Sequence, residues 1–285
     1  MDKKPNKQGK ISEPAATAKA EKNSPIKKAH SAGKTIAVFN TKGGVGKTFI
    51  VDNLALALAQ NADVKVVIVD LDLHSGDACT MLNLKPKRTI SDLVENIEFY
   101  APTDIEKMLT PVNANVKIMA APLEPEVAES IKGELIVRLI NLVKEIADYV
   151  IVDTPSAFNE IVLAAIGVVD RIYLIATEDL LALKDALLSS QTLQLLDFPE
   201  EKVKFVLNRS KSVVGLTDRE IEQSLGMRIW ATIPSDRTVP VSMNTGLPLV
   251  IHYPRSPAAR SIFRLAAHTT NSFSAEAKRK RREAA

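Results

Sequence analysis

The sequence predicts a doubly wound α/β fold, in which a mostly parallel sheet carries helices on both faces. Short apolar runs alternate with longer stretches that have leucine and alanine at helical spacing, as in repeated strand and helix units. Three of these apolar runs, residues 36–40, 64–70 and 149–153, end in a glycine-rich turn or an aspartate. The carboxyl ends of parallel strands meet at one edge of the sheet, where open α/β folds bind ligands. We therefore expect the functional site at that edge.

Length and composition indicate one domain. A chain of 285 residues is long enough for a large α/β domain with a buried core. The hydrophobic fraction of 46% is ordinary for a globular protein, and charges interrupt the apolar runs, so we expect no transmembrane segment. The amino-terminal segment lacks the apolar stretch of a secretory signal, and Cys79 is the only cysteine. Both facts favour a reducing, cytoplasmic setting and a buried, unreactive thiol.

The charge is unevenly distributed along the chain. Residues 1–34 hold nine lysines against three acidic residues, a balance of +6, and residues 276–285 have a balance of +3. We expect a disordered basic N-terminal tail at 1–34, the folded domain at 35–270 and a basic C-terminal tail at 271–285. The N-terminal tail is either a solvated tether or an electrostatic contact with nucleic acid, anionic lipid or an acidic partner.

A glycine-rich turn, TKGGVGKT at 41–48, joins the first strand to a helix. Its glycines let the backbone adopt positive φ and turn consecutive N–H groups toward phosphate oxygens, and the helix points its positive end at the same anion. Lys47 supplies a full charge for the β- and γ-phosphates, and the Thr48 hydroxyl is placed to bind Mg²⁺. The glycines concerned are Gly43, Gly44 and Gly46.

This turn departs from the strict pattern G-x-x-x-x-G-K-[ST], because position 41 is Thr and a second lysine, Lys42, follows it. The run KGGVGKT resembles the deviant Walker A motif of the ParA/MinD ATPases, which are P-loop NTPases. The resemblance implies ATP and Mg²⁺ as cofactors, held by the loop from Gly43 through Val45 to Phe49. It also implies that Lys42 reaches across a dimer interface to the partner's nucleotide. The family usually has a second Thr or Ser where this chain has Phe49, so only the backbone N–H remains there for the α-phosphate.

Two of the predicted strands end in carboxylates, Asp70 with Asp72 after the first and Asp153 at the end of the other. Such groups lie beside the phosphate loop in an open sheet, although Asp70 and Asp72 can also be read as caps of the next segment. Mg²⁺ needs oxygen ligands beside the β- and γ-phosphates, so we expect Asp153 to hold it through water. The resemblance implies that Asp72 orients the attacking water. Thr48, Asp72 and Asp153 are the expected metal residues, with switch regions around Asp72 and at 154–159.

The second half of the chain supplies the rest of the predicted sheet. Strands are expected at 116–119, 171–176, 204–208 and 229–233, and long helices at 127–146 and 180–196. Asn208 ends one of these strands, and by the resemblance it recognises the adenine edge. The stretch at 239–248 resembles the family's closing segment beside the base.

These observations predict an ATP-dependent dimerising switch ATPase, with weak hydrolysis stimulated by a partner protein, that positions a cellular cargo. The runs DLDLHSGD at 70–77, AAPLEPEVAE at 120–129 and DTPSAFNE at 153–160 look most like the CpaE/TadZ branch, which localises Flp pilus machinery. Chromosome or plasmid partition is the other cargo considered. The alternatives are a nucleotide-binding scaffold with negligible catalysis and a MinD-like membrane-associated regulator of division or flagellar placement. A metabolic P-loop enzyme is disfavoured because no further substrate-binding cluster stands out.

The C-terminus carries an apolar helix followed by a basic run. We expect residues 256–270 to form a helix that packs on the sheet, and the run at 278–282, KRKRR, to follow it as a tail. MinD-like proteins end in an amphipathic membrane-binding helix, but the apolar face here is short. The basic tails are therefore expected to give weak, salt-sensitive attraction to nonspecific DNA or another anionic surface. The expected location is the cytoplasm, at the nucleoid, the cell pole or the inner membrane surface.

Overall fold

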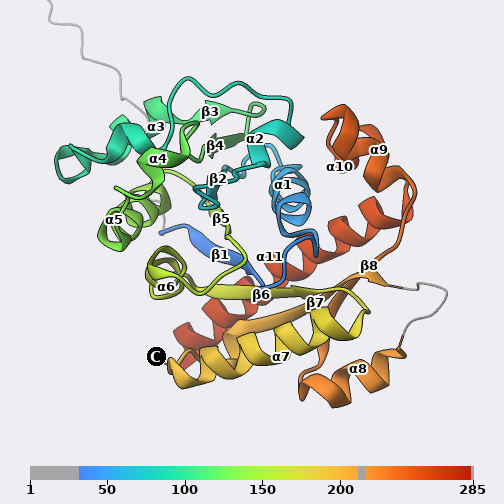
Figure 1. Cartoon of the computed structure of the whole chain (residues 1–285). Coiled ribbons are helices and arrows are strands. Elements are labelled where there is room, and N and C mark those ends of the chain that lie inside the picture. The colour runs from blue at the N-terminus through green and yellow to red at the C-terminus, as the bar shows by residue number, and fades with distance from the viewer. Residues whose placement is uncertain (1–31, 211–215, 284–285) are drawn as a thin grey trace, which may run out of the picture.

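The computed structural model describes residues 32–210 and 216–283. Within these residues eight strands form one sheet in the order β3-β4-β2-β5-β1-β6-β7-β8 (Figure 1). The edge strand β3 runs antiparallel to β4, and every other pairing is parallel. The predicted doubly wound, mostly parallel sheet is confirmed.

The strands agree closely with the predicted ones, apart from small shifts at their ends. The fifth and sixth have the predicted bounds, whereas the first begins two residues earlier and ends before Asn40. Their bounds are β1 Lys34–Phe39, β2 Val66–Asp70, β3 Thr110–Pro111, β4 Val116–Met119, β5 Tyr149–Asp153, β6 Arg171–Ala176, β7 Val203–Ser210 and β8 Ile229–Pro234.

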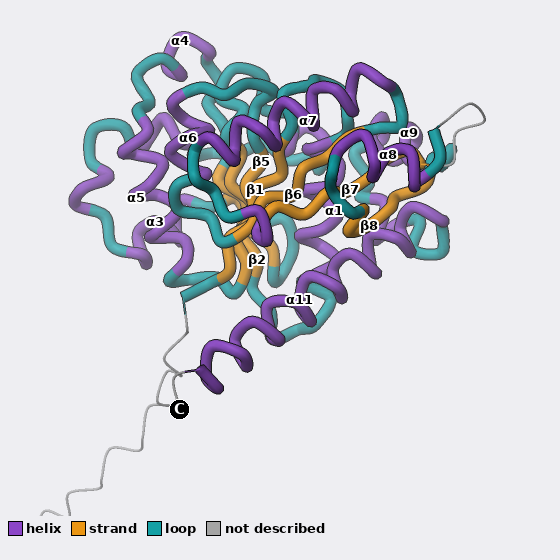
Figure 2. Tube along the Cα trace, turned by 90° about the horizontal axis from the view of Figure 1, so that it is seen from below, coloured by secondary structure: helices purple, strands orange, loops and turns teal. Residues whose placement is uncertain are grey.

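Helices cover both faces of the sheet, which explains why its central strands are apolar without alternation (Figure 2). Helices α1, α10 and α11 pack together on one face, while α5 with α6 and α7 with α8 lie on the other. The α-helices are α1 Lys47–Leu58, α2 Ala78–Met81, α3 Pro102–Met108, α4 Pro125–Ala128, α5 Gly133–Lys144, α6 Glu160–Ile166, α7 Leu180–Leu195, α8 Asp218–Leu225, α9 Thr238–Thr245, α10 Leu249–His252 and α11 Pro257–Glu283. The described part of the chain also has three 3-10 helices, at Ile90–Leu93, Ile97–Phe99 and Glu200–Lys202.

The helix predicted at 127–146 is wrong in its extent, because the chain there forms two helices, α4 and α5. The second begins at Gly133, whose backbone N–H donates to the Glu160 carboxylate at 2.8 Å. A Cβ at Gly133 would lie 2.9 Å from the Cβ of Ala164 on α6. A glycine is therefore needed where α5 starts against α6, and the chain turns there instead of continuing one helix.

The final helix is longer than predicted. Residues 271–283, expected to belong to a tail, continue α11 through the basic run. Phe273 is 6% exposed, and Glu276 forms an ion pair with Arg171 on β6. These two contacts extend the packed part of the helix beyond Thr270. The predicted packing of its first half is confirmed, since Ile262 and Leu265 are buried.

The predicted N-terminal tail lies outside the described residues except for 32–34, and Lys34 already begins β1. In the part of the chain that the structure describes, no helix is long and apolar enough to cross a bilayer. Cys79 is buried, as expected.

The strand order brings the predicted site residues to one place. Strand β5 lies between β2 and β1, and in this register Asp153 is level with Asp70 on one side and Val38 on the other. The phosphate loop leaves the end of β1, one residue beyond that level. Two aspartates and the loop therefore meet at the carboxyl edge of the sheet.

Candidate functional site

The loop between β1 and α1 is held by side chains and by glycine geometry. Asn40 donates to the carbonyl of Ile175 on β6 and accepts from the backbone N–H of Lys42 at 2.9 Å. Gly44 and Gly46 have φ of 74° and 94°, the left-handed region that glycine tolerates. Gly43 does not have positive φ, so the loop uses the left-handed region at two of its three glycines.

The first turn of α1 presents its N–H groups and one lysine to the loop. The turn contains no acidic residue, so the positive end of the helix is not neutralised from within. Lys47 is only 8% exposed, and its ammonium donates to the hydroxyl of Ser156 at 2.6 Å. Burial lowers the pKa of Lys47, while the nearby carboxylates Asp153 and Asp72 oppose that shift. This is the arrangement expected for a lysine that binds an anion.

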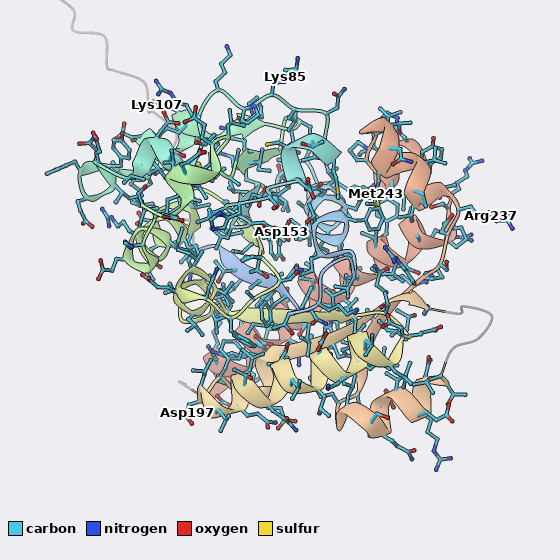
Figure 3. The ribbon with its side chains drawn as sticks, in the orientation of Figure 1. Lys85, Lys107, Asp153, Asp197, Arg237 and Met243 are labelled. Carbon is cyan, nitrogen blue, oxygen red and sulfur yellow. The ribbon has the colours of Figure 1, made fainter. Side chains whose placement is uncertain are left out.

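A buried carboxylate lies next to this lysine. Asp153 is 1% exposed, and neither of its oxygens accepts a hydrogen bond of ordinary geometry from the described residues, although Thr48 lies against it. Burial raises the pKa of Asp153 to about 7, against the opposing effects of Thr48 and Lys47. Figure 3 places Asp153 in the middle of the fold, between the sheet and α1. A buried oxygen without a partner indicates a place for a ligand or ion.

Asp70 and Asp72 complete the acidic group. Asp70 is buried and accepts the backbone N–H of Asp72 at 3.1 Å, which fixes the turn after β2. Burial raises the pKa of Asp70, and Asp153 adds to that effect. Asp72 is half-buried, so its side chain can face a ligand at the loop. Asp70 thus orders the turn that positions Asp72, which agrees with the structural interpretation of Asp70, while the ligand-binding interpretation of the pair stays a prediction.

The donor set fits a hard divalent cation. Oxygen atoms from carboxylates and a threonine hydroxyl are the ligands that Mg²⁺ prefers. Thr48 and Asp153 are in contact, and Asp72 is close enough to affect the pKa of Asp153. A cation here would also relieve the repulsion between the buried carboxylates. Residues Thr48, Asp72 and Asp153 are therefore together in space, and their role as a metal site stays a prediction.

Lys42, the second lysine of the loop, lies near the start of α7. It is half-buried, and its charge helps to lower the pKa of Asp179, after the larger effect of the Thr177 hydroxyl. Asp179 is the N-cap of α7 and accepts the backbone N–H of Ala182 at 2.9 Å. The loop therefore presents one buried lysine, at the carboxylates, and one partly exposed lysine, at its rim beside the start of α7.

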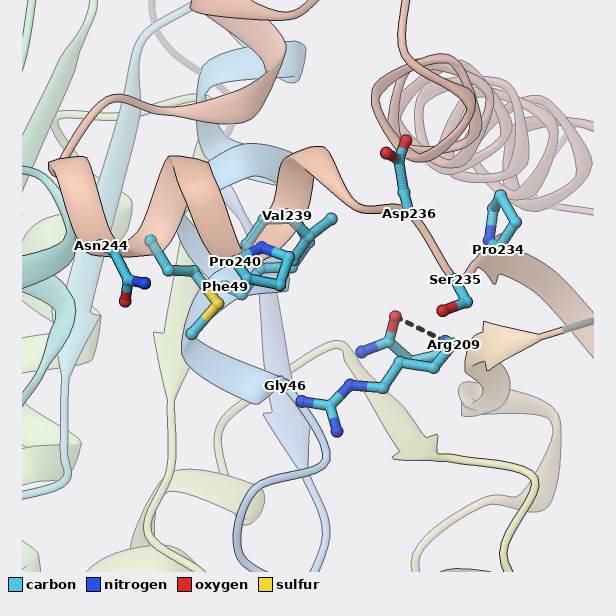
Figure 4. A pocket seen from close by; sticks show the side chains of 11 residues that line it. Gly46, Phe49, Arg209, Pro234, Ser235, Asp236, Val239, Pro240 and Asn244 are labelled. Atoms are coloured by element: carbon cyan, nitrogen blue, oxygen red, sulfur yellow. Dashed lines mark hydrogen bonds between the residues drawn. The ribbon is translucent and has the colours of Figure 1, made fainter. Parts of the chain in front are cut away.

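A cavity of about 380 Å³ adjoins the loop. It starts at Gly46 and extends between α1, the end of β7 and α9, where Asn208 is buried with its side-chain amide bonded to the carbonyl of Val45 at 2.8 Å. A Cβ at Gly46 would collide with that amide. Figure 4 shows Arg209 extending over the cavity toward Gly46. The lining residues are Gly46, Phe49, Asn208, Arg209, Pro234, Ser235, Asp236, Val239, Pro240, Met243 and Asn244.

Three side chains of this site were not singled out from the sequence, although Ser156 lies in the switch region expected at 154–159. Ser156 accepts the Lys47 ammonium, Arg209 lines the cavity, and Asp52 is a fully buried acid whose two oxygens have no partner among the described residues. Asp52 is the only acid in the apolar helix α1, and that pattern was the available signal. Arg209 gave none, because its left-handed backbone (φ 53°) is visible only in the structure.

The chain is similar to known proteins over most of its length. Residues 33–197, more than half of the chain, match the family AAA_31, described as AAA domain. The septum site-determining protein MinD of Thermotoga maritima is 29% identical over 231 residues, covering 77% of this chain and 82% of the relative. A ParA family ATPase of Chlorobium tepidum has a similar structure, with a TM-score of 0.78 and 24% identity over 83% of this chain and 100% of that one. So does a MinD of Pyrococcus horikoshii complexed with Mg-ADP, with a TM-score of 0.72 and 22% identity over 82% and 94% of the chains.

Proposed function

The chain belongs to the AAA domain family and is a ParA/MinD-type ATPase, and on this premise we propose that it is a nucleotide-driven switch that positions a cellular cargo. ATP binding joins two copies into a dimer, the dimer engages a surface or partner, and slow hydrolysis releases it. The observation that carries this proposal is the pair of lysines on one loop. Lys47 is buried beside the carboxylates, and Lys42 is at the rim where a second copy can be reached.

Each residue of the site has a role in this cycle. Thr48 and Asp153 would hold Mg²⁺, which when bound would supply positive charge for the β- and γ-phosphates. Lys47 supplies charge for the same phosphates, Asp72 orients the attacking water, and Lys42 completes the site of the second copy. Ser156 keeps the Lys47 ammonium in place until a phosphate replaces it.

The nucleoside occupies the cavity beside the loop. Asn208 reads the adenine edge there, and the backbone N–H groups from Gly43 to Phe49 hold the phosphates. The shared position of Gly46, on the loop and on the cavity wall, supports this placement because one ligand can occupy both. The volume of about 380 Å³ is also within the usual range for small-molecule sites.

Dimerisation tests the proposal directly. We expect light scattering to give a monomer without nucleotide and a dimer with ATP, most clearly in Asp72→Ala, which blocks hydrolysis. Lys42→Ala should prevent the dimer while keeping nucleotide binding, because Lys42 lies at the rim of the loop. A monomer under every nucleotide condition would refute the switch.

A scaffold with negligible catalysis is the second candidate, and Phe49 is the observation that favours it. The hydroxyl that the family usually places at this position is absent, so one contact to the α-phosphate is lost. Steady-state phosphate release, measured alone and with partner proteins, separates the two. Release that stays at the level of Asp72→Ala in every mixture would favour the scaffold.

The surface of α7 supports binding of an activating partner protein. Leu181, Leu188 and Leu195 lie seven residues apart on this helix and are 64%, 48% and 85% exposed. Residues at this spacing share one face of a helix, so they form an apolar stripe that starts near Lys42 and Asp179. Exposed apolar stripes of this kind mark interaction sites. Leu188→Glu should abolish stimulation by the partner and leave unstimulated release unchanged.

The end of α11 supports a polyanion as the surface, in preference to a membrane. Residues 274–283 contain no apolar side chain larger than alanine, so the basic run has no group to insert into a bilayer. Lys278, Arg279, Lys280, Arg281 and Arg282 are exposed around the helix. Their charge is suited to the phosphates of nonspecific DNA, and a dimer doubles the contacts.

Truncation tests this surface. A chain ending at Ala277 keeps the Glu276–Arg171 ion pair and removes the basic run, so the helix stays packed. We expect it to lose salt-sensitive binding to nonspecific DNA. Salt-resistant binding of the full chain to anionic liposomes would instead support the MinD-like membrane regulator. The cargo, whether pilus machinery or a chromosome or plasmid, and the place within the cytoplasm follow from whichever partner is captured.

A further inference from the structure

Phe49 turns its ring away from the phosphate loop. Lys47 and Thr48, the residues before it, face Ser156 and Asp153, and a helix turns by about 100° per residue. The ring of Phe49 is 3% exposed and lines the cavity beside the loop. Its side chain therefore belongs to the cavity, although its backbone N–H belongs to the loop.

Helix α9 covers this ring. Figure 4 shows Phe49 on α1 beneath Val239 and Pro240, and Met243 lies one turn further along the same helix. All four line the same cavity. Figure 3 also places Met243 on the side of α9 that faces α1. Together these residues make an apolar wall that connects the first turn of α1 to α9.

The opposite side of the cavity is polar. The Asn208 amide and Arg209 come from the end of β7, and Asp236 from the segment after β8. Asp236 is already occupied, since it accepts from the N–H groups of Thr238 and Ala258 at 2.9 and 3.0 Å. An apolar wall facing an amide and a guanidinium fits a flat aromatic group with a polar edge, which describes a nucleobase.

We propose that Phe49 is a nucleoside-affinity residue of this site. Its ring, together with Val239, Pro240 and Met243 of α9, forms the wall against which the base of the nucleotide binds. This inference rests on the proposed function, because it assumes that phosphates bind the adjacent loop. The site then gains affinity from the nucleoside at the same position where it lacks a hydroxyl for the phosphate.

Two ligands distinguish binding at the apolar wall from binding at the phosphate loop. Isothermal titration of the full chain with Mg²⁺ compares ADP, which reaches both, with inorganic pyrophosphate, which reaches only the loop. We expect Phe49→Ala to weaken ADP by about tenfold, the scale of one aromatic contact, and Phe49→Leu by about threefold. Pyrophosphate should bind all three proteins equally. Met243→Ala should also weaken the binding of ADP.

Ile50→Ala is the matched control. Ile50 is the next residue of α1, is fully buried and does not line the cavity, so its loss lowers stability without touching the ligand. Melting temperatures identify any variant that fails to fold. If Phe49→Ala fails to fold, the ADP affinity of Phe49→Leu tests the inference. Unchanged ADP affinity in Phe49→Leu and Phe49→Ala, or equal losses for ADP and pyrophosphate, would overturn the inference. Wild-type protein that binds neither ligand would overturn the nucleotide site itself, and this inference with it.

Discussion

The two edges of the sheet carry opposite buried charges. At the carboxyl edge, Asp52, Asp70 and Asp153 are each no more than 2% exposed, and Lys47 is the buried cation near them. At the amino edge, the buried Arg171 and the half-buried Lys204 lie beneath α11 near the starts of β6 and β7. Burial without compensation is costly for either sign of charge. Each edge must therefore stabilise its buried charge.

The amino edge compensates its charge within the chain. The Arg171 guanidinium lies 3.9 Å from the centre of the Phe273 ring and pairs with Glu276 through Nη2, while its Nε and Nη1 are buried without a hydrogen-bond partner among the described residues. The Lys204 ammonium lies 5.0 Å from the Trp230 ring. Aromatic faces attract cations, and the effect is larger where water is excluded. Burial still lowers the pKa of Lys204, and Arg171 adds to that shift. These contacts of Arg171 with Phe273 and Glu276, called the α11 joint below, fix the end of α11 against the sheet.

The carboxyl edge is not compensated in the same way. The oxygens of Asp52 and Asp153 have no hydrogen-bond partners among the described residues, and burial raises the pKa of both carboxyls. The chain can relieve this cost by binding a proton or a cation. The difference indicates that buried carboxylates without an ion pair among the described residues mark the ligand site, whereas a buried cation with an ion pair and an aromatic contact marks structure.

Breaking the α11 joint at the amino edge should have the largest effect. Glu276→Gln leaves the Arg171 guanidinium, which is 1% exposed, without a carboxylate. We expect the free energy of unfolding to fall by about 1–3 kcal/mol, the cost of an uncompensated charged hydrogen bond. Chemical denaturation of the full chain measures it.

The control for this prediction is Glu283→Gln. That carboxylate pairs with Arg279, but both side chains are mostly exposed, so the change should stay within about 0.5 kcal/mol. A second test combines Glu276→Gln with Arg171→Met, which removes the charge that was left unpaired. If the double variant is less stable than Glu276→Gln alone, the ion pair is not what holds this end of α11.

Neutralising the acid at the carboxyl edge should have the opposite sign and a smaller size. Asp52→Asn removes a fully buried carboxyl whose pKa is raised well above its usual value, chiefly by burial and then by Asp153 and Asp70. A carboxyl with a raised pKa stabilises the fold fully only below its unfolded pKa near 4, and that stability is lost as pH rises toward the folded pKa. The effect is smaller than at Arg171 because the acid can bind a proton.

Melting temperatures from pH 4 to pH 8 measure this effect. Asp52→Asn should match the wild type near pH 4 and exceed it increasingly at higher pH. Asp63→Asn, at an exposed carboxyl before β2, should run parallel to the wild type throughout. Parallel curves for Asp52→Asn as well would mean that Asp52 is not strained by burial.

The sequence predicted the carboxyl edge better than the amino edge. Strands that end in aspartate beside a glycine-rich turn indicate a phosphate and metal site locally, and this pattern is the basis on which Asp72 and Asp153 were predicted. The burial of Asp52 beside the other carboxylates could not be predicted, because the sequence does not show that α1 packs against β2 and β5. The α11 joint pairs Arg171 with Glu276, which are 105 residues apart, and no local pattern connects them. For the same reason the helix was predicted to end too early.

Metal binding at the carboxyl edge should depend weakly on pH. Mg²⁺ competes with protons for a carboxylate, and the pKa of Asp153 is raised to about 7 by burial. Lowering the pH from 7.5 to 6.5 then reduces the ionised fraction of this group, and the Mg²⁺ affinity with it, by about threefold, or about 0.7 kcal/mol. Titrating Mg²⁺ into the ADP-bound protein at both pH values measures this. Asp153→Asn is the control, because it keeps the shape of the side chain and retains only the pH dependence of the nucleotide's own phosphates. An equal pH dependence in the wild type and Asp153→Asn would mean that Asp153 is already ionised before the metal binds. The negative charge at the carboxyl edge would then be stabilised by something other than protonation of Asp153.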